Sequence, residues 1–440
     1  MRVPRHVAVI VALTLCVAPR LGADWPQWRG PDGTGIAPAA APVEWGVDFN
    51  VRWRADIWGL GVSSPIVSGD LVIVTSQAGF VPLELGSHPT LAAGNVDGAD
   101  RPLGGSPGGG AERIQFIVEA FDRASGGALW AHTLSAGGPV QAVHQKHNLA
   151  SSSPVTDGER IYATFGTGQT VALTMDGKEV WSRHLGEEYG PLQIIWGYSS
   201  SPVVYGELLI LQCDRTADAY LLALDTRTGE ERWKVDRGDG LRSYSTPVVV
   251  PGPSGDELIV NSSERIDAYD PRTGAHLWYT GGPNEFPVPV ATHADGALYA
   301  SRGHRSGPYM KIRLGGRGDI SDTHVDWRVP TGAPYVSSIL YYDGLIYMAN
   351  GSGIVTCVDA ETGETVWRER LGGVYTASPV AAGGYVYFFS ETGEAIVLAA
   401  GRDPVVAARN DIAARILASP AISDGHLFIR TDRQLVAIGR

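Results

Sequence analysis

The chain is poor in cysteine, with three in 440 residues and no two of them adjacent. Cys16 lies in an apolar segment at the N-terminus, which leaves Cys213 and Cys357 in the rest of the chain. Exported proteins that depend on disulfides carry many cysteines at regular spacings. The sequence therefore predicts no disulfide framework.

Long apolar runs are also absent beyond the first residues, because no later stretch approaches the roughly 20 residues that a transmembrane helix needs. The N-terminus combines a basic start, an apolar run over 7–18 and small residues just before position 24. This pattern is typical of a secretory signal peptide, here residues 1–23. Leu15, rather than a small residue, precedes Cys16, so a lipoprotein is not expected. We expect a periplasmic or secreted protein that does not span the membrane.

Positive charge is scarce as well, since 35 Lys and Arg residues stand against 47 Asp and Glu residues, a net charge of −12. Removing three arginines with residues 1–23 leaves −15. An acidic surface repels phosphate backbones, so nucleic-acid binding is not expected. No glycine-rich loop leads from a strand into a helix, and no serine lies in a nucleophile elbow. The sequence thus carries no phosphate-binding or hydrolase signature.

Repetition is what the chain has in abundance. A small-x-Asp-x-x-Ser/Thr-Gly-x-x-x-Trp motif occurs at 120–130, 223–233, 268–278 and 357–367, with a shortened copy at 175–181. A second motif, built on Ser-Pro and an alternating strand, occurs at 63–74, 152–163, 200–211, 245–260, 377–388 and 418–429. Weaker copies of it fall at 288–300 and 336–348, which makes eight repeats.

Each repeat predicts four short strands, with proline at the start of the first and Thr-Gly in the turn before the fourth. Four-strand units that recur every 40–50 residues are the signature of a β-propeller. We therefore predict an all-β, eight-bladed β-propeller that forms one domain over 48–440. An N-terminal extension, 24–47, precedes it.

Closure of the ring is predicted from its two ends. The eighth repeat ends at 434–440 with three strands, and residues 48–57 form a strand with no partner of its own. If the N-terminal strand completes the last blade, two sheet edges are hidden. We predict that arrangement.

The repeated tryptophans are interpreted as structural. A tryptophan four residues after the Thr-Gly turn would project into the gap between adjacent blades, where its indole N–H finds a carbonyl. A motif that recurs around the ring is also a poor candidate for a unique active site. The residues assigned this role are Trp53, Trp130, Trp181, Trp233, Trp278, Trp327 and Trp367.

The Ala-x-Asp-x-x-Thr-Gly-x-x-x-Trp unit resembles the tryptophan-docking repeat of pyrroloquinoline quinone (PQQ) dehydrogenases over roughly residues 50–440. The same repeat occurs in non-enzymatic relatives, including the propeller lipoprotein of the outer-membrane β-barrel assembly machinery. The mature chain is also similar to exported bacterial PQQ-like β-propeller repeat proteins, through the segments 24–33, 148–167, 317–327 and 408–421. This resemblance implies the fold and the compartment, but no settled reaction.

The resemblance also bears on cofactors. The quinone enzymes of this fold place adjacent cysteines beneath PQQ, with calcium and an Asp base above it. This chain has no Cys-Cys pair. We therefore expect no cofactor and no catalytic residues, and keep PQQ with calcium only for the alternative of a quinoprotein dehydrogenase.

Two patterns could bind metal. On a strand, Asp322, His324 and Asp326 would share one face and could form a carboxylate–His cluster, but a solvated outer strand with a polar face and a buried Trp327 is the preferred interpretation. His144 and His147 lie in the connection into the second blade, but no third ligand is near them in sequence. We predict no metal site.

Binding is expected on the long loops of one propeller face. These are the insertion 78–112 between the second and third strands of the first blade, and the blade-to-blade connections 135–149 and 187–197. Alignment on Ser-Pro places three tyrosines at one position, either as part of an aromatic collar or simply as strand-edge residues. The candidate ligand or partner residues are Tyr198, Tyr335, Tyr375, His144, His147 and Trp196.

The sequence thus predicts a monomeric, exported, non-catalytic binding or scaffold protein. Its unidentified protein or small-molecule ligand would bind over blades one to three. A quinoprotein dehydrogenase and an outer-membrane assembly scaffold are the alternatives.

Overall fold

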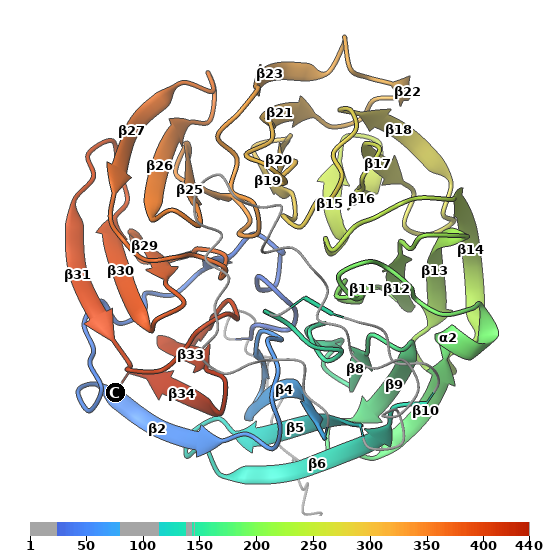
Figure 1. The fold of residues 1–440 in the computed structure, drawn as a ribbon, viewed down its shortest axis with the longest axis horizontal. Coiled ribbons are helices and arrows are strands. Elements are labelled where there is room, and N and C mark those ends of the chain that lie inside the picture. The colour runs from blue at the N-terminus through green and yellow to red at the C-terminus, as the bar shows by residue number, and fades with distance from the viewer. Residues whose placement is uncertain (1–23, 80–113, 138–142, 145, 440) are drawn as a thin grey trace, which may run out of the picture.

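The computed structural model describes residues 24–79, 114–137, 143–144 and 146–439. Eight four-stranded units surround a central axis (Figure 1), so the predicted eight-bladed β-propeller is confirmed. The one helix in these described ranges is the single turn α2 (Leu185–Glu188). No helix in the described part of the chain is long and apolar enough to cross a membrane.

The strands of each blade run from the axis outward. Blades one to four consist of β3 (Ile66–Ser68), β4 (Leu71–Ala78), β5 (Gln115–Asp122) and β6 (Ala128–Ser135); β7 (Val155–Thr156), β8 (Arg160–Thr164), β9 (Gln169–Thr174) and β10 (Glu179–His184); β11 (Val203–Tyr205), β12 (Leu208–Cys213), β13 (Ala219–Asp225) and β14 (Glu231–Gly238); and β15 (Val248–Gly252), β16 (Gly255–Asn261), β17 (Ile266–Tyr269) and β18 (His276–Thr280). Blades five to eight consist of β19 (Thr292–Ala294), β20 (Ala297–Ser301), β21 (Tyr309–Arg313) and β23 (Val325–Val329); β24 (Leu340–Tyr342), β25 (Leu345–Ala349), β26 (Ile354–Asp359) and β27 (Thr365–Arg370); β28 (Val380–Ala382), β29 (Tyr385–Phe389), β30 (Glu394–Ala399) and β31 (Val406–Asp411); and β32 (Ala421–Ser423), β33 (His426–Arg430), β34 (Gln434–Ile438) and β2 (Val51–Asp56).

The last blade is closed by the N-terminal strand, as the sequence predicts. β2 pairs antiparallel with β34, and Trp53 lies opposite Ala437. The edge of β34 is therefore covered by a strand that precedes it by almost the whole length of the chain (Figure 1).

Six tryptophan side chains bridge adjacent blades. Their indole N–H groups donate to a carbonyl in the outer turn of the following blade, at 3.0–3.2 Å, in the pairs Trp53–Arg123, Trp130–Met175, Trp181–Thr226, Trp233–Pro271, Trp327–Ala360 and Trp367–Gly401. The glycine of the Thr-Gly turn lies against the indole ring of the tryptophan from the preceding blade. A Cβ added to Gly229, whose φ is +73°, would lie 2.7 Å from Trp181. The glycine is thus required both by the turn and by the close approach of the indole.

Trp278 is bonded differently because the fifth blade lacks the Asp-x-x-Thr-Gly turn. A short extra strand, β22 (Gly318–Asp319), takes that place and pairs parallel with β18, with Gly318 opposite Trp278. The indole N–H of Trp278 donates instead to the Glu257 carboxylate of its own blade, at 2.7 Å.

The N-terminal extension crosses the face of the propeller at which the innermost strands end. Trp25 exchanges two backbone hydrogen bonds with Val67 of the first blade. Farther along, the buried Arg29 guanidinium donates to the carbonyl of Ile339 at the sixth blade, at 2.9 Å. The strand β1 (Ile36–Ala37) then pairs parallel with β28 of the seventh blade. This segment therefore forms a floor under the central axis.

Candidate functional site

A cavity of about 210 Å³ lies on the propeller axis, since residues from all eight blades line it. Its floor is Trp28 of the N-terminal extension. Its walls are the extended segments that enter the innermost strands, so side chains two residues apart face the axis in two tiers. Above these tiers lie the connections between blades.

The lower tier, next to Trp28, is a ring of seven hydroxyl side chains and one valine. Its members are Ser64, Ser153, Ser201, Thr246, Val290, Ser338, Ser378 and Ser419. At six of the eight joints between blades, the backbone N–H of one member donates to the hydroxyl oxygen of the next, at 2.9–3.0 Å. Val290 interrupts the ring because it has no hydroxyl to accept a hydrogen bond from the backbone N–H of Thr246. The Ser-Pro repeat thus joins neighbouring blades as well as starting each strand.

The upper tier is mostly apolar. Its members are Val62, Ser151, Ser199, Tyr244, Val288, Val336, Thr376 and Leu417. An apolar belt above a ring of hydroxyls gives the cavity two chemically distinct levels. Such a small number of fixed polar groups within apolar walls is typical of ligand pockets.

Six rings form an arc around the mouth of the cavity, which we call the aromatic collar. In order they are His147, His144, Trp196, Phe286, His304 and Tyr335, with centroids 4.9–6.4 Å apart. Three of them belong to the connections into blades two and three, and the other three to blade five and its flanking connections. The collar therefore extends beyond blades one to three.

The two collar histidines of the second connection are neutral at physiological pH. Burial lowers the pKa of His144 to about 3, assisted by the neighbouring His147 and Lys146, and burial likewise lowers the pKa of His147. His147 Nε2 faces the carbonyl oxygen of Trp196, and Nδ1 lies 3.2 Å from that of Asn148. These rings therefore offer polar edges without charge.

A buried ion pair lies beside the collar. Lys146 Nζ is 2.7 Å from a carboxylate oxygen of Glu391, and both side chains are more than nine-tenths buried. Thr376 Oγ1 donates to the same carboxylate. Because Glu391 follows β29, this pair fixes the connection into the second blade against the seventh blade.

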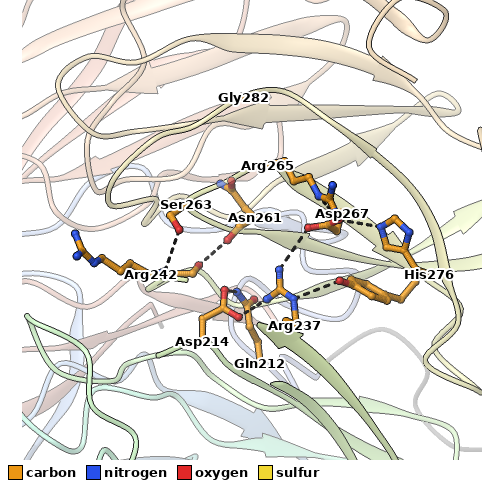
Figure 2. Close-up of polar contacts among 12 residues, drawn as sticks. Gln212, Asp214, Arg237, Arg242, Asn261, Ser263, Arg265, Asp267, His276 and Gly282 are labelled. Atoms are coloured by element: carbon orange, nitrogen blue, oxygen red, sulfur yellow. Dashed lines mark hydrogen bonds and ion pairs between the residues drawn. The ribbon is translucent and has the colours of Figure 1, made fainter. Parts of the chain in front are cut away.

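A second polar cluster holds blades three and four together under the same face (Figure 2). Arg237 lies between Asp214 and Asp267, and His276 Nε2 is 2.9 Å from Asp267. Burial favours the neutral form of Asp267, but the hydrogen bond from His276 and the charges of Arg237 and Arg265 hold its pKa below the usual value. The cluster neutralises its own charges and thus acts as a joint between blades.

The predicted tyrosines are divided between two environments. Tyr335 lines the cavity and belongs to the collar. Tyr198 and Tyr375 are 1% and 2% exposed and lie in the hydrophobic cores between blades. Their shared alignment position therefore does not give them a shared surface.

Several site residues were not predicted from the sequence, namely Trp28, Tyr244, Phe286 and His304. The sequence carries one signal for His304, which stands between Gly303 and Gly307. In the structure, Arg305 and Ser306 of this segment both have positive φ, at 52° and 58°. Strain of that kind is concentrated at functional sites.

The strand interpretation of the carboxylate–His pattern is wrong. Residues 321–324 form a turn, so Asp322 and His324 do not alternate on a strand with Asp326. Asp326 instead accepts from Arg313 Nε at 2.7 Å. Within the described ranges, no group of three His, Cys, Asp or Glu side chains is placed to hold a metal ion.

The cavity does not fit PQQ, an anionic quinone with three carboxyl groups. Among the described lining residues, Lys146 is the one cation, and Glu391 already neutralises it. The buried thiols of Cys213 and Cys357 belong to blades three and six and form no disulfide beneath the axis.

Comparisons with known proteins agree with this architecture. A family model described as outer membrane protein assembly factor BamB matches residues 115–284, 321–403 and 351–439, more than half of the chain. The chain is 23% identical to tetrathionate hydrolase from Acidithiobacillus ferrooxidans over 76% of its own length and 64% of the relative, so it spans less than two thirds of that protein. It is 23% identical to BamB of Salmonella typhimurium over 63% of its own length and 70% of the relative.

A solved structure extends the comparison. The quinohemoprotein alcohol dehydrogenase of Comamonas testosteroni superposes with a TM-score of 0.61 at 12% identity, covering 95% of this chain and 81% of that one. At this identity the likeness shows the fold alone.

Proposed function

Because the chain belongs to the family of outer membrane protein assembly factor BamB, we propose that it is a non-catalytic binding protein that takes its ligand on the face where the blade-to-blade connections meet. In this proposal residues 1–23 direct export and are removed, and the remaining protein acts as a monomer in the periplasm or outside the cell. The propeller over 48–440 is one rigid domain, and the extension 24–47 closes its floor.

The observation that carries the proposal is the axial cavity beneath the aromatic collar. It combines a closed floor, an apolar belt and a mouth lined with aromatic side chains. A rigid ring of blades keeps these groups in place before any ligand arrives, which lowers the entropic cost of binding. Long connections on a rigid scaffold are where binding functions are generally found.

The polar groups at the mouth favour binding over catalysis. His147 Nδ1 lies 3.1 Å from Ser151 Oγ, the spacing of a base and a nucleophile. The hydroxyl of Ser151, however, donates to the carbonyl of Asn148 at 2.6 Å, and the other nitrogen of His147 faces a carbonyl rather than a carboxylate. With its pKa lowered by burial, this imidazole is a weak base, and the pair lacks the orienting acid of a catalytic triad.

A cavity-filling variant tests the proposal. Val336→Trp places an indole in the upper tier, whereas the control Val405→Trp adds the same side chain at an exposed outer position. Each protein is incubated with the small-molecule fraction of a cell-envelope extract, repurified and denatured, and the released compounds are identified by mass spectrometry. We expect compounds that accompany the wild type and the control but are lost from Val336→Trp. Equal profiles for all three proteins would contradict a ligand site in the cavity.

A role as an assembly scaffold is the second candidate, and the family match favours it. In that case the collar face would contact a protein of the outer-membrane assembly machinery. Crosslinking in intact envelopes would then capture such a component with both wild type and Val336→Trp, because a protein surface does not need an open cavity.

A further inference from the structure

The hydroxyls of the lower tier each have a proton left to donate. In six of them the oxygen accepts a backbone N–H from the preceding blade. For the protons of these same hydroxyls, no acceptor is found among the described residues. A hydroxyl that accepts one bond keeps its O–H free to rotate toward the axis. Each of these hydroxyls therefore offers a ligand one O–H and one remaining lone pair, and the N–H that it already accepts polarises it toward donation.

Nothing in the described lining offers negative charge to compete with these donors. The lining residues include no Asp or Glu. Glu391 lies outside the lining and is occupied by Lys146 and Thr376. Six of the eight backbone N–H groups of the ring donate within the ring itself. A group that enters this level thus meets O–H donors and no ionised carboxylate among the described lining residues.

The volume of the cavity limits the size of the apolar part of a ligand. At about 210 Å³ the cavity exceeds the roughly 150 Å³ in which a protein interior holds one benzene molecule. The apolar belt of Val62, Val288, Val336 and Leu417 surrounds this volume directly above the donor ring. One ring, or a branched chain of similar bulk, fills it.

We propose that the cavity binds a small amphipathic carboxylate, with its apolar body in the upper tier and its carboxylate oxygens on the hydroxyl ring. This inference rests on the proposed function and adds the class of ligand. Hydrogen bonds from hydroxyls to a carboxylate are short and about twice as strong as those between neutral groups. Several of them together offset the cost of taking one negative charge out of water. An ammonium group would lose its water and find no ionised carboxylate in the described lining, only hydroxyl oxygens that already accept one N–H.

The experiment uses three one-ring probes that differ only in their polar group: benzoate, benzyl alcohol and benzylamine. Their binding to the full mature chain at pH 7.5 is measured by isothermal titration calorimetry. We expect benzoate to bind at least about tenfold more tightly than benzylamine, a difference of about 1.4 kcal/mol. Benzyl alcohol, which is neutral, should lie between them.

Two variants of the hydroxyl ring and one matched control test whether the ring hydroxyls cause the preference for benzoate. Ser201→Ala and Ser338→Ala each remove one donor from the ring, on blades three and six. Ser152→Ala removes a hydroxyl that donates to the carbonyl of Ser200 and does not line the cavity. Both ring variants should weaken the binding of benzoate about fivefold or more, as the loss of a hydrogen bond to a charged group does. The control variant should bind benzoate as the wild type does. Thermal melts identify any variant that fails to fold, and the other ring variant then decides.

The possible failures are distinguishable. If benzylamine binds as tightly as benzoate, or if both ring variants bind benzoate like the wild type, the carboxylate assignment is overturned while a ligand site in the cavity remains. If none of the three probes binds, the assignment is overturned too, and the extract experiment with Val336→Trp decides separately whether the cavity binds anything.

Discussion

At the scale of single residues, Trp181 illustrates what the repeated motif does. Its ring packs on Gly229 of the next blade, and its N–H donates to the carbonyl of Thr226 at 3.0 Å. Trp181→Ala should lower the free energy of unfolding by about 3–5 kcal/mol, as the loss of a large buried side chain does. Denaturant unfolding measures this, with the exposed Leu129→Ala as the control. A loss below about 1 kcal/mol would mean that the indole does not hold the blades together.

Glu119 makes stability depend on pH. Burial is the main cause that raises its pKa to about 7, although the Trp58 N–H and the charge of Arg430 oppose the shift. A carboxyl with a folded pKa above its unfolded value holds its proton more tightly in the native state. It therefore stabilises the fold fully below about pH 4.5, and this contribution is lost as the pH rises to about 7.

Glu119→Gln should accordingly flatten the decline in stability between pH 4.5 and 7, because the amide keeps an acceptor for Trp58 and does not titrate. Unfolding midpoints of the wild type, this variant and the surface variant Glu159→Gln, measured across that interval, give the comparison. Wild-type and Glu119→Gln curves that run parallel would contradict the assignment.

At the scale of elements, the closing strand β2 can be tested with proline. Ile57 N–H donates to the Arg433 carbonyl, and bonded pairs alternate along an antiparallel ladder, so the Ala55 N–H points at β34 and the Arg54 N–H points outward. Ala55→Pro should cost about 1–3 kcal/mol, the penalty of an unsatisfied buried carbonyl, and Arg54→Pro much less. Thermal unfolding of the two variants tests this, and equal losses would mean that the proline ring, rather than the lost bond, is responsible.

The elements also show how far sequence reasoning extends. Strands, turns and the closing role of β2 were predictable because each repeats, or completes, one local pattern. The floor formed by the extension 24–47 and the strand β22 were not predictable, because each depends on contacts with distant parts of the chain. The same limit explains why the three tyrosines were wrongly expected to share a surface. Their position relative to Ser-Pro is a local feature of the sequence, whereas the burial of Tyr198 and Tyr375 depends on side chains of the adjacent blades. Non-repeating residues such as Phe286 and His304 carry no periodic signal at all.

At the scale of the whole molecule, adjacent blades are linked near the axis in two ways. Six joints use the hydroxyl–amide bonds at the axis, and a buried arginine spans each of the remaining two. Arg302 of blade five donates to the side chain of Asn261 and to the carbonyls of Ser263 and Gly282 (these three residues are labelled in Figure 2). Arg430 of blade eight donates to the carbonyls of Ser63 and Thr75 of blade one. Arginine thus replaces the hydroxyl link where that link is missing.

This arrangement predicts that each arginine protects its own joint. Arg430→Met leaves the buried Ser63 carbonyl without its arginine donor and takes one of two side-chain donors from the Thr75 carbonyl. It should cost about 2–4 kcal/mol, from about 1–3 for the first carbonyl and about 1 for the second. Hydrogen exchange should then accelerate in β3, β4, β33 and β34, whereas Arg302→Met should accelerate it in β16, β17 and β20. The exposed Arg402→Met is the control. Uniform acceleration around the ring in both variants would show that the propeller opens as one cooperative unit, and that the arginines stabilise the whole ring rather than individual joints.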